Sequence, residues 1–170
     1  RFWETIEAVE EGIAERVPLP NVPPNEEVKT DVPDGDAVKA IRGYAGEFEY
    51  ASRRHVEFEL VAEVGIRLGA LRGIDLGDIE PERLVIHLRD RPGEAGAYGT
   101  PLKNGADGER IINISPDLVK LLEAYIDHNR FQVPGNGDRE PLLTSQNGRV
   151  STATIRRDFY KLTQPCEYDL

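Results

Sequence analysis

The sequence contains one cysteine, Cys166, and no methionine among its 170 residues. A single cysteine excludes an internal disulfide and fits a cytoplasmic compartment. No apolar run approaches the roughly 20 residues that cross a bilayer, and the opening residues RFWETIEAVEEG have neither the basic nor the apolar region of a signal peptide. We therefore expect a cytoplasmic protein with no membrane partner. Because no methionine begins the sequence, we also expect these residues to be part of a longer protein.

Lysine is scarce as well, and this changes what the net charge means. The 21 basic residues comprise five lysines and 16 arginines, against 31 acidic residues, for a net charge of −10. This balance is unfavourable for nucleic-acid binding, which needs Lys and Arg to neutralise phosphate. An acidic surface with few lysines is typical of a halophilic protein, whose acidic side chains keep it solvated in concentrated salt. In such a protein the local placement of arginine says more about partners than the net charge does.

The first 36 residues carry one expected helix and a linker. Apolar side chains spaced at three and four predict an amphipathic helix over residues 1–17: Phe2, Ile6, Val9 and Ile13. Residues 18–36 contain five of the twelve prolines and predict an extended linker. One helix cannot form a core alone, so the linker is expected to mark a domain boundary.

From residue 37 onward the pattern predicts an α+β fold that is mainly helical. The expected helices cover 37–48, 53–64 after an N-cap at Ser52, a short segment that ends at Gly73, Pro116 to about 131, and 152–163 after an N-cap at Ser151. Between the third and fourth helices, β-rich segments at 82–90 and 108–115 predict a hairpin. The core is expected to include Tyr44, Phe48, Phe58, Leu60 and Val64.

Two basic residues stand in positions that suit an anion site. Arg67, in VGIRLGALRGIDLGDIE, follows an apolar run at the junction of two expected helices. Lys103, in TPLKNGADGERIINIS, lies near the expected tip of the hairpin. A guanidinium on a rigid apolar base can hold a phosphate with paired hydrogen bonds. Both residues also have a simpler interpretation, as a solvated helix-end arginine and an ordinary turn lysine.

These stretches resemble the tyrosine recombinase, or phage integrase, family, most closely its halophilic archaeal members. The matching features are the Gly-Ile-Arg junction that contains Arg67, the LRGIDLGDIE stretch after it, the lysine of KNGADGERIINI, and the stretches YASRRH and PLLTSQNGRVS. The resemblance covers residues 36–166. It implies that 1–17 is the last helix of an N-terminal core-binding (SAM-like) domain, that 18–36 is the Pro-rich linker between two domains, and that 37–170 is the N-terminal part of the catalytic domain.

The resemblance implies site-specific DNA recombination or integration. In that reaction a tyrosine hydroxyl attacks a phosphodiester to give a 3′-phosphotyrosine and a free 5′-hydroxyl, and no metal or other cofactor is needed because the covalent intermediate keeps the bond energy. By this resemblance Arg67 clamps the phosphate, and Lys103 protonates the leaving 5′-oxygen as a general acid. The implied partner is double-stranded DNA, with self-association on it and no small-molecule substrate.

The sequence also departs from the family pattern. The Glu that usually follows the first arginine by three residues is Ala70 here. The family's His-x-x-Arg segment is absent, because no histidine is followed by arginine at the third position: His55, His87 and His128. In the family the nucleophilic tyrosine lies beyond that segment, and the last tyrosines of this sequence come too early to be it. We therefore expect these 170 residues to be inactive alone.

Further basic residues are candidates for DNA contact: Arg53, Arg54 and His55 at the start of one helix, and Arg156 and Arg157 in the last. A charged, solvated helical surface explains them equally well. Cys166 would need further ligands to form a metal site, so no metal is expected.

Three functions stay open on the sequence. The first is a fragment of a site-specific DNA recombinase. The second is a non-catalytic DNA-binding or regulatory integrase remnant, and the third is a small α+β protein-interaction module. Affinity for DNA that falls steeply as salt rises separates the first two from the third.

Overall fold

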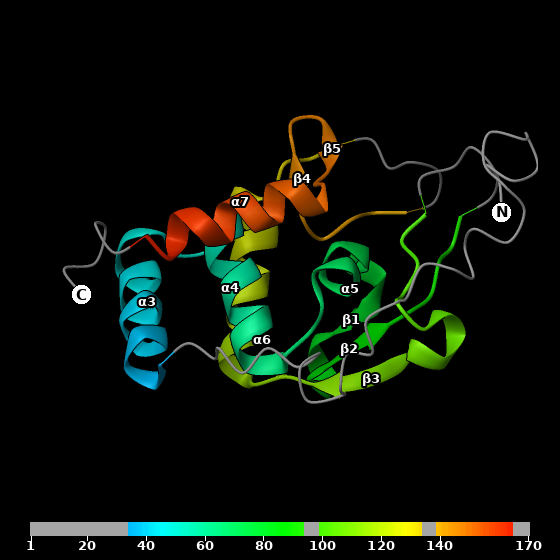
Figure 1. Ribbon diagram of the computed structural model, residues 1–170, viewed down its shortest axis with the longest axis horizontal. Coiled ribbons are helices and arrows are strands. Elements are labelled where there is room, and N and C mark those ends of the chain that lie inside the picture. The colour runs from blue at the N-terminus through cyan, green and yellow to red at the C-terminus, as the bar shows by residue number, and fades with distance from the viewer. Residues whose placement is uncertain (1–33, 94–98, 134–138, 165–170) are drawn as a thin grey trace, which may run out of the picture. The chain divides into compact units, whose positions relative to one another are not determined.

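The structure is a computed structural model that describes residues 34–93, 99–133 and 139–164 (Figure 1). The helix expected over 1–17 and most of the expected linker lie outside these residues. Residues Asp34–Leu170 form one unit. Within the described part of that unit, no helix is long and apolar enough to span a membrane.

The first two helices of this unit begin and end at local signals in the sequence. Helix α3 (Gly35–Phe48) is capped by the Asp34 side chain and begins two residues earlier than predicted, inside the expected linker. Helix α4 (Arg53–Val64) matches the prediction, and the Ser52 side chain accepts a hydrogen bond from a backbone amide of its first turn. It ends at Gly65, whose φ of 66° lies in the left-handed region that glycine favours.

The β-rich segments form a three-stranded antiparallel sheet in the order β1-β2-β3. As predicted, β2 (Val85–Leu88) pairs with β3 (Arg110–Asn113), and Leu88 lies opposite Arg110 at the end of the ladder. The sequence pattern does not predict β1 (Ile79–Glu80), because two residues are too few to show alternation. The sheet is reached from α5 (Leu68–Gly73), which ends at the predicted residue.

The second half of the unit returns to helix. Helix α6 (Pro116–Ala124) begins at the predicted proline and continues as a single π-helical segment, η4 (Tyr125–Asn129), so the helical region ends two residues before the predicted position. A two-stranded hairpin of β4 (Thr144–Ser145) and β5 (Gly148–Arg149) follows, where the sequence predicts only a turn. Helix α7 (Thr152–Leu162), capped by Ser151, matches the prediction.

Most helices share one core. The main core joins α4, α5, the sheet and α6 through buried residues such as Leu60, Leu71, Ile86 and Leu122. A smaller cluster of apolar residues joins α3 to α4 and α7. Figure 1 shows α7 lying across α4, with α3 at one end of α7 and α5 toward the other. Helix α7 therefore contacts both helices that flank Arg67.

The core prediction is right for four residues and wrong for one. Phe58 and Leu60 are buried, while Tyr44 and Val64 are partly buried against the core. Phe48 is 67% exposed. It is the last residue of α3 and lies beyond the part of the helix that packs in the smaller cluster. Its ring instead packs beside Tyr44, at 5.2 Å between ring centroids.

Candidate functional site

Arg67 lies where α4 ends and α5 begins. Gly65 turns the chain out of α4, and Ile66, which is 5% exposed, inserts into the main core. Arg67 is the N-cap residue of α5, with extended backbone (φ −72°, ψ 149°), and its side chain makes no capping hydrogen bond. The exposed guanidinium has no hydrogen bond or ion pair to another described residue. The junction therefore holds a permanent cation on a buried base and leaves its donors available.

Lys103 does not lie at the tip of a simple hairpin, in contrast to the prediction. After β2 the chain continues to Arg91, whose carbonyl accepts a 2.6 Å hydrogen bond from the Thr100 amide. Lys103 therefore stands on the segment that returns to β3. Leu102 before it packs against the main core, and Lys103 itself is exposed. Like Arg67, Lys103 has no hydrogen bond or ion pair to any other residue that the structure describes.

Arg67 and Lys103 line the same cavity, whose volume is about 320 Å³. Helix α5, the segment before β3 and the first residue of β3 contribute further lining residues, among them Gly69, Ala70, Asp107, Glu109 and Arg110. Because Ala70 stands three residues after Arg67, α5 has no carboxylate there to pair with the guanidinium. The three cations and two carboxylates of this lining leave one positive charge in surplus, which suits a singly charged phosphodiester.

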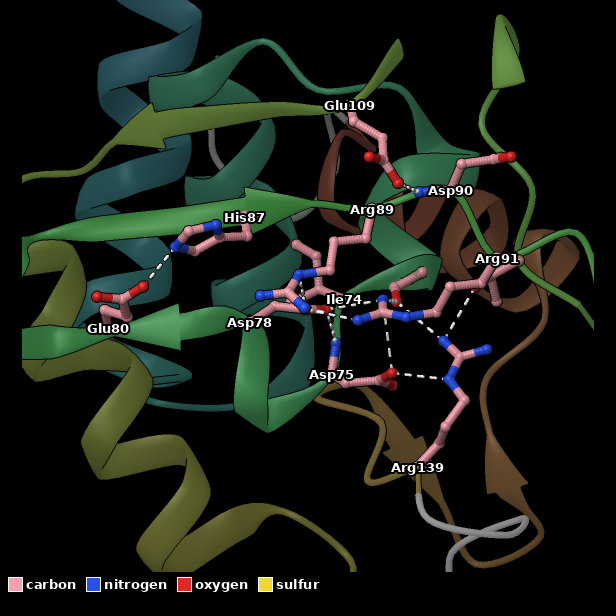
Figure 2. A network of polar contacts seen from close by, with 12 residues as sticks. Ile74, Asp75, Asp78, Glu80, His87, Arg89, Asp90, Arg91, Glu109 and Arg139 are labelled. Atoms are coloured by element: carbon pink, nitrogen blue, oxygen red, sulfur yellow. Dashed lines mark hydrogen bonds and ion pairs between the residues drawn. The ribbon is translucent and has the colours of Figure 1, made fainter. Parts of the chain in front are cut away.

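A network of arginine and aspartate side chains holds the end of α5 beside the sheet (Figure 2). Asp78 is 1% exposed and accepts hydrogen bonds of 2.9 and 2.6 Å from Arg91 and one of 2.9 Å from the Asp75 amide. The Asp75 carboxylate pairs with Arg139 at 2.7 Å and with Arg149. Burial alone would raise the pKa of Asp75, but the hydrogen bonds from the two arginines outweigh it and hold the pKa below its usual value.

Sequence reasoning does not find this network. Asp75 and Asp78 stand in the LRGIDLGDIE stretch, so the Asp-x-x-Asp spacing directly after a short helix was the available signal. Their arginine partners come from three separate segments of the chain, and no local pattern joins those segments. The network restrains the chain on the C-terminal side of α5 and so helps to fix the helix that Arg67 caps.

The three basic residues at the start of α4 have partners within the protein. Arg53 pairs with Asp158 of α7 at 2.5 Å, and Arg54 pairs with Glu49 at 2.5 Å. His55 is 6% exposed, and burial lowers the pKa of its ring. These contacts give all three residues a structural role, and their contact with DNA stays a prediction.

Arg156 and Arg157 lie on the exposed side of α7. Neither has a hydrogen bond or ion pair to another described residue, and the same is true of Lys161 in the last turn of the helix. Over the described ranges, the Arg and Lys side chains without such a partner are these three together with Arg67 and Lys103. The fold thus leaves unpaired four of the seven basic residues that the sequence singles out.

No group of three or more His, Cys, Asp or Glu side chains that could hold a metal ion occurs among the described residues. Cys166 lies outside them.

Comparison with protein-family models finds no match, and comparison with curated proteins finds none either. Solved structures do match. One of XerA recombinase is similar over 94% of this chain and 51% of its own, with 21% identity and a TM-score of 0.60. One of Tn1549 transposon integrase in complex with circular intermediate DNA is similar over 99% of this chain and 55% of its own, with 18% identity and a TM-score of 0.62. A structure of the same integrase with transposon right end DNA covers 77% and 43%, with 20% identity and a TM-score of 0.56.

These likenesses show the fold. The unit has the α+β, mainly helical fold of the tyrosine recombinase catalytic domain, in the order helices, small sheet, helices. The chain spans about half the length of the solved structures that it matches. At these identities the likeness extends to the fold, and activity has to be argued from the site.

Proposed function

We propose that this chain is the N-terminal part of a tyrosine recombinase catalytic domain and that Arg67 and Lys103 bind a phosphodiester of duplex DNA. The observation that carries the proposal is the cavity that both residues line. They come from separate parts of the fold, and neither side chain forms a hydrogen bond or ion pair with another described residue. The matched XerA recombinase and the DNA-bound transposon integrase support the same class of function.

The chemistry assigns a different task to each cation. The Arg67 guanidinium stays charged and offers two parallel donors to the non-bridging oxygens of the phosphodiester. Lys103 donates a proton to the 5′-oxygen as its bond to phosphorus breaks. A tyrosine hydroxyl forms the new bond to phosphorus, and we propose that none of the tyrosines in this sequence is that nucleophile.

Helix α7 supplies a second group of DNA contacts in this proposal. Arg156 and Arg157 are exposed and unpaired among the described residues, and α7 packs against α5, whose N-cap residue is Arg67. Cations on the outside of a helix neutralise backbone phosphates without reading sequence. The family resemblance implies self-association on DNA, and we propose it here as well.

A salt titration of DNA binding tests the proposal. We expect a duplex to bind, with affinity that falls steeply as salt rises, and we expect Arg67→Ala and Arg156→Ala each to reduce the salt slope by about one because each removes a phosphate contact. Arg83→Ala is the matched control, since Arg83 is exposed, pairs with Glu80 and lies outside the cavity. Circular dichroism at each salt concentration checks that the protein stays folded. Equal losses for all three variants would contradict the proposed site.

Strand cleavage distinguishes the catalytic role from simple binding. We expect the 170 residues to bind a nicked duplex and to form no covalent protein–DNA adduct, because the family resemblance implies that the nucleophilic tyrosine is missing from them. In a full-length enzyme that contains this chain, Arg67→Ala is expected to slow adduct formation by on the order of 10²–10³-fold. Normal cleavage by that variant would contradict the catalytic role of Arg67 and would leave it at most a role in DNA binding.

An aromatic surface favours protein contact as a second candidate function. Phe48, Tyr50 and Phe131 are 67%, 57% and 44% exposed and line one cavity of about 430 Å³. Arg53 and Arg54, in the same lining, have their charges paired with carboxylates. Exposed aromatic residues are enriched in protein interfaces. A folded protein that fails to bind DNA at low salt would support this function and contradict the recombinase proposal.

A further inference from the structure

The segment that carries Lys103 is held at its base by one residue, through its side chain at one end and its backbone amide at the other. One residue, Arg89, separates Asp90 from the end of β2, and Asp90 contacts both ends of the segment 102–109; Figure 2 shows its contact with Glu109. Its Oδ1 accepts a 2.7 Å hydrogen bond from the Leu102 amide. Its own amide donates a 2.7 Å hydrogen bond to the Glu109 carboxylate. Lys103 is therefore the first residue inside a loop whose two ends are tied to Asp90.

Further contacts restrain the residue next to Lys103. The Leu102 side chain packs against the main core, and its carbonyl accepts a 3.1 Å hydrogen bond from the Gly105 amide. Gly105 has a φ of 57° and lies so near Asp90 that a Cβ there would be 3.9 Å from Oδ2 of that carboxylate. The loop then forms a 3-10 turn over Gly105–Gly108 before it enters β3.

We propose that Asp90 is a positioning residue that holds Lys103 at the cavity before any DNA is bound. The proposal rests on the proposed function of Lys103 and adds a residue that does not itself line the cavity but hydrogen-bonds two residues that do, Leu102 and Glu109. The regular β2–β3 ladder ends at Leu88 and Arg110, so backbone pairing does not reach the loop. Asp90 replaces that pairing with two hydrogen bonds, one of them to its charged carboxylate, and such charge-assisted bonds are the stronger kind.

The consequence for function is preorganisation. A lysine on a free loop has to be ordered when DNA arrives, and ordering each residue opposes binding and catalysis. A lysine that is already ordered at the cavity does not lose this conformational entropy during binding and reaction. The alternative is that Asp90 only stabilises the fold or only contributes negative charge, in which case Lys103 acts independently of it.

Amide hydrogen exchange tests the tie in the protein without DNA. Asp90→Ala removes the acceptor, and the Leu102 amide is expected to exchange about tenfold faster or more, the effect of losing one charge-assisted hydrogen bond. Asp90→Asn removes the charge but keeps an oxygen acceptor, so it is expected to restore most of the protection. Amides of α4 serve as the internal reference for the fold, and Asp127→Ala, an exposed change on η4, is the charge control. Unchanged exchange at Leu102 in Asp90→Ala would overturn the proposal.

A double-mutant cycle then tests positioning against a merely structural role. Duplex affinity at low salt is measured for the original protein, Lys103→Ala, Asp90→Ala and the double variant. Positioning predicts that Lys103→Ala weakens binding several-fold in the original protein and by less than about twofold in the Asp90→Ala background, because Lys103 has lost its place there. Additive losses would overturn the proposal.

The two experiments separate this proposal from the function on which it rests. If Lys103→Ala leaves the affinity of the original protein unchanged, Lys103 does not contact DNA, and both the proposed role of Lys103 and its positioning by Asp90 are overturned. If the Leu102 amide exchanges fast in Asp90→Ala while Lys103→Ala leaves DNA affinity unchanged, the hydrogen bond from Leu102 to Asp90 exists but the proposed function of Lys103 is wrong.

Discussion

At the scale of single residues, Glu57 has the most unusual environment. Its side chain is 1% exposed on α4, and neither carboxylate oxygen has a hydrogen-bond partner. Arg53 Nε lies 3.2 Å from one of these oxygens, in a contact without hydrogen-bond geometry. Burial, followed by repulsion from Asp158, raises the pKa of Glu57 to about 8 despite the attraction of Arg53. At neutral pH this carboxyl therefore holds a proton in the folded protein.

Stability is expected to fall as pH rises because of Glu57. The pKa of Glu57 is about 8 in the folded protein against an ordinary value of 4.5, so the folded state binds this proton more tightly than the unfolded state does. The free energy of unfolding therefore decreases as the pH rises from about 4.5 to about 8. Glu57→Gln, which keeps the shape without the charge, is expected to recover on the order of 3 kcal/mol of unfolding free energy at pH 8 and little at pH 5. Urea unfolding at both pH values measures the difference. Glu123→Gln, an exposed change on α6, is expected to keep the original pH dependence.

At the scale of elements, one ion pair joins α4, which precedes Arg67, to α7, which carries Arg156 and Arg157. Arg53 at the start of α4 reaches Asp158 in the middle of α7 and also donates to the Thr144 carbonyl before the β4–β5 turn. Desolvation opposes the charge of Arg53, yet its hydrogen bond and Coulomb attraction to Asp158 raise its pKa above the ordinary value. Helix α7 is therefore tied to α4 by a half-buried charge pair in addition to apolar packing.

Removal of Arg53 is expected to destabilise the fold rather than to weaken a DNA contact alone. Arg53→Ala leaves the buried Asp158 carboxylate without its cation, and such a loss destabilises by about 3–5 kcal/mol. Arg42→Ala breaks a more exposed pair with Glu59 and is expected to change stability by less than about 1 kcal/mol. Denaturant unfolding compares the two variants. A loss of DNA affinity in Arg53→Ala with unchanged stability would instead favour direct contact with phosphate.

At the scale of the whole molecule, charge balance is the dominant feature. The net charge is −10, and many of the arginines are paired with carboxylates in the described part of the fold. Surface carboxylates without a cation repel one another, and this repulsion opposes the compact state. The unpaired cations at the cavity and on α7 are exceptions within an acidic protein. They are local sites of attraction for an anion.

Added salt is expected to stabilise the fold. Raising the salt concentration from 0.1 M to 1 M shortens the screening length from about 10 Å to about 3 Å, which weakens repulsion between exposed carboxylates more than it weakens half-buried ion pairs. We therefore expect Tm to rise with sodium chloride, as it does for a halophilic protein. Thermal unfolding followed by circular dichroism measures the effect. A Tm that falls over the same range would show that exposed ion pairs contribute more than repulsion does.

Local signals in the sequence determined most of the elements. Caps at Ser52 and Ser151, proline at the start of α6 and glycine at the end of α4 each act within one helical turn, so they could be recognised without knowledge of the fold. Arg67 and Lys103 could be selected for the same reason, because each stands in a distinctive local pattern. The strands β1, β4 and β5 have two residues each, too few to show a period.

Tertiary structure decided which of these residues meet. The cavity shared by Arg67 and Lys103, the ties from Asp90 to Leu102 and Glu109, and the burial of Glu57 all depend on segments that the chain brings together only on folding. The exposure of Phe48 was decided in the same way, because the end of packing along α3 depends on its neighbours. Hydrogen-bonded turns and caps form between near neighbours in sequence, whereas charge pairing and burial depend on the whole packed core. For this reason the candidate site residues could be recognised in the sequence, but only the tertiary structure showed which of them lie together.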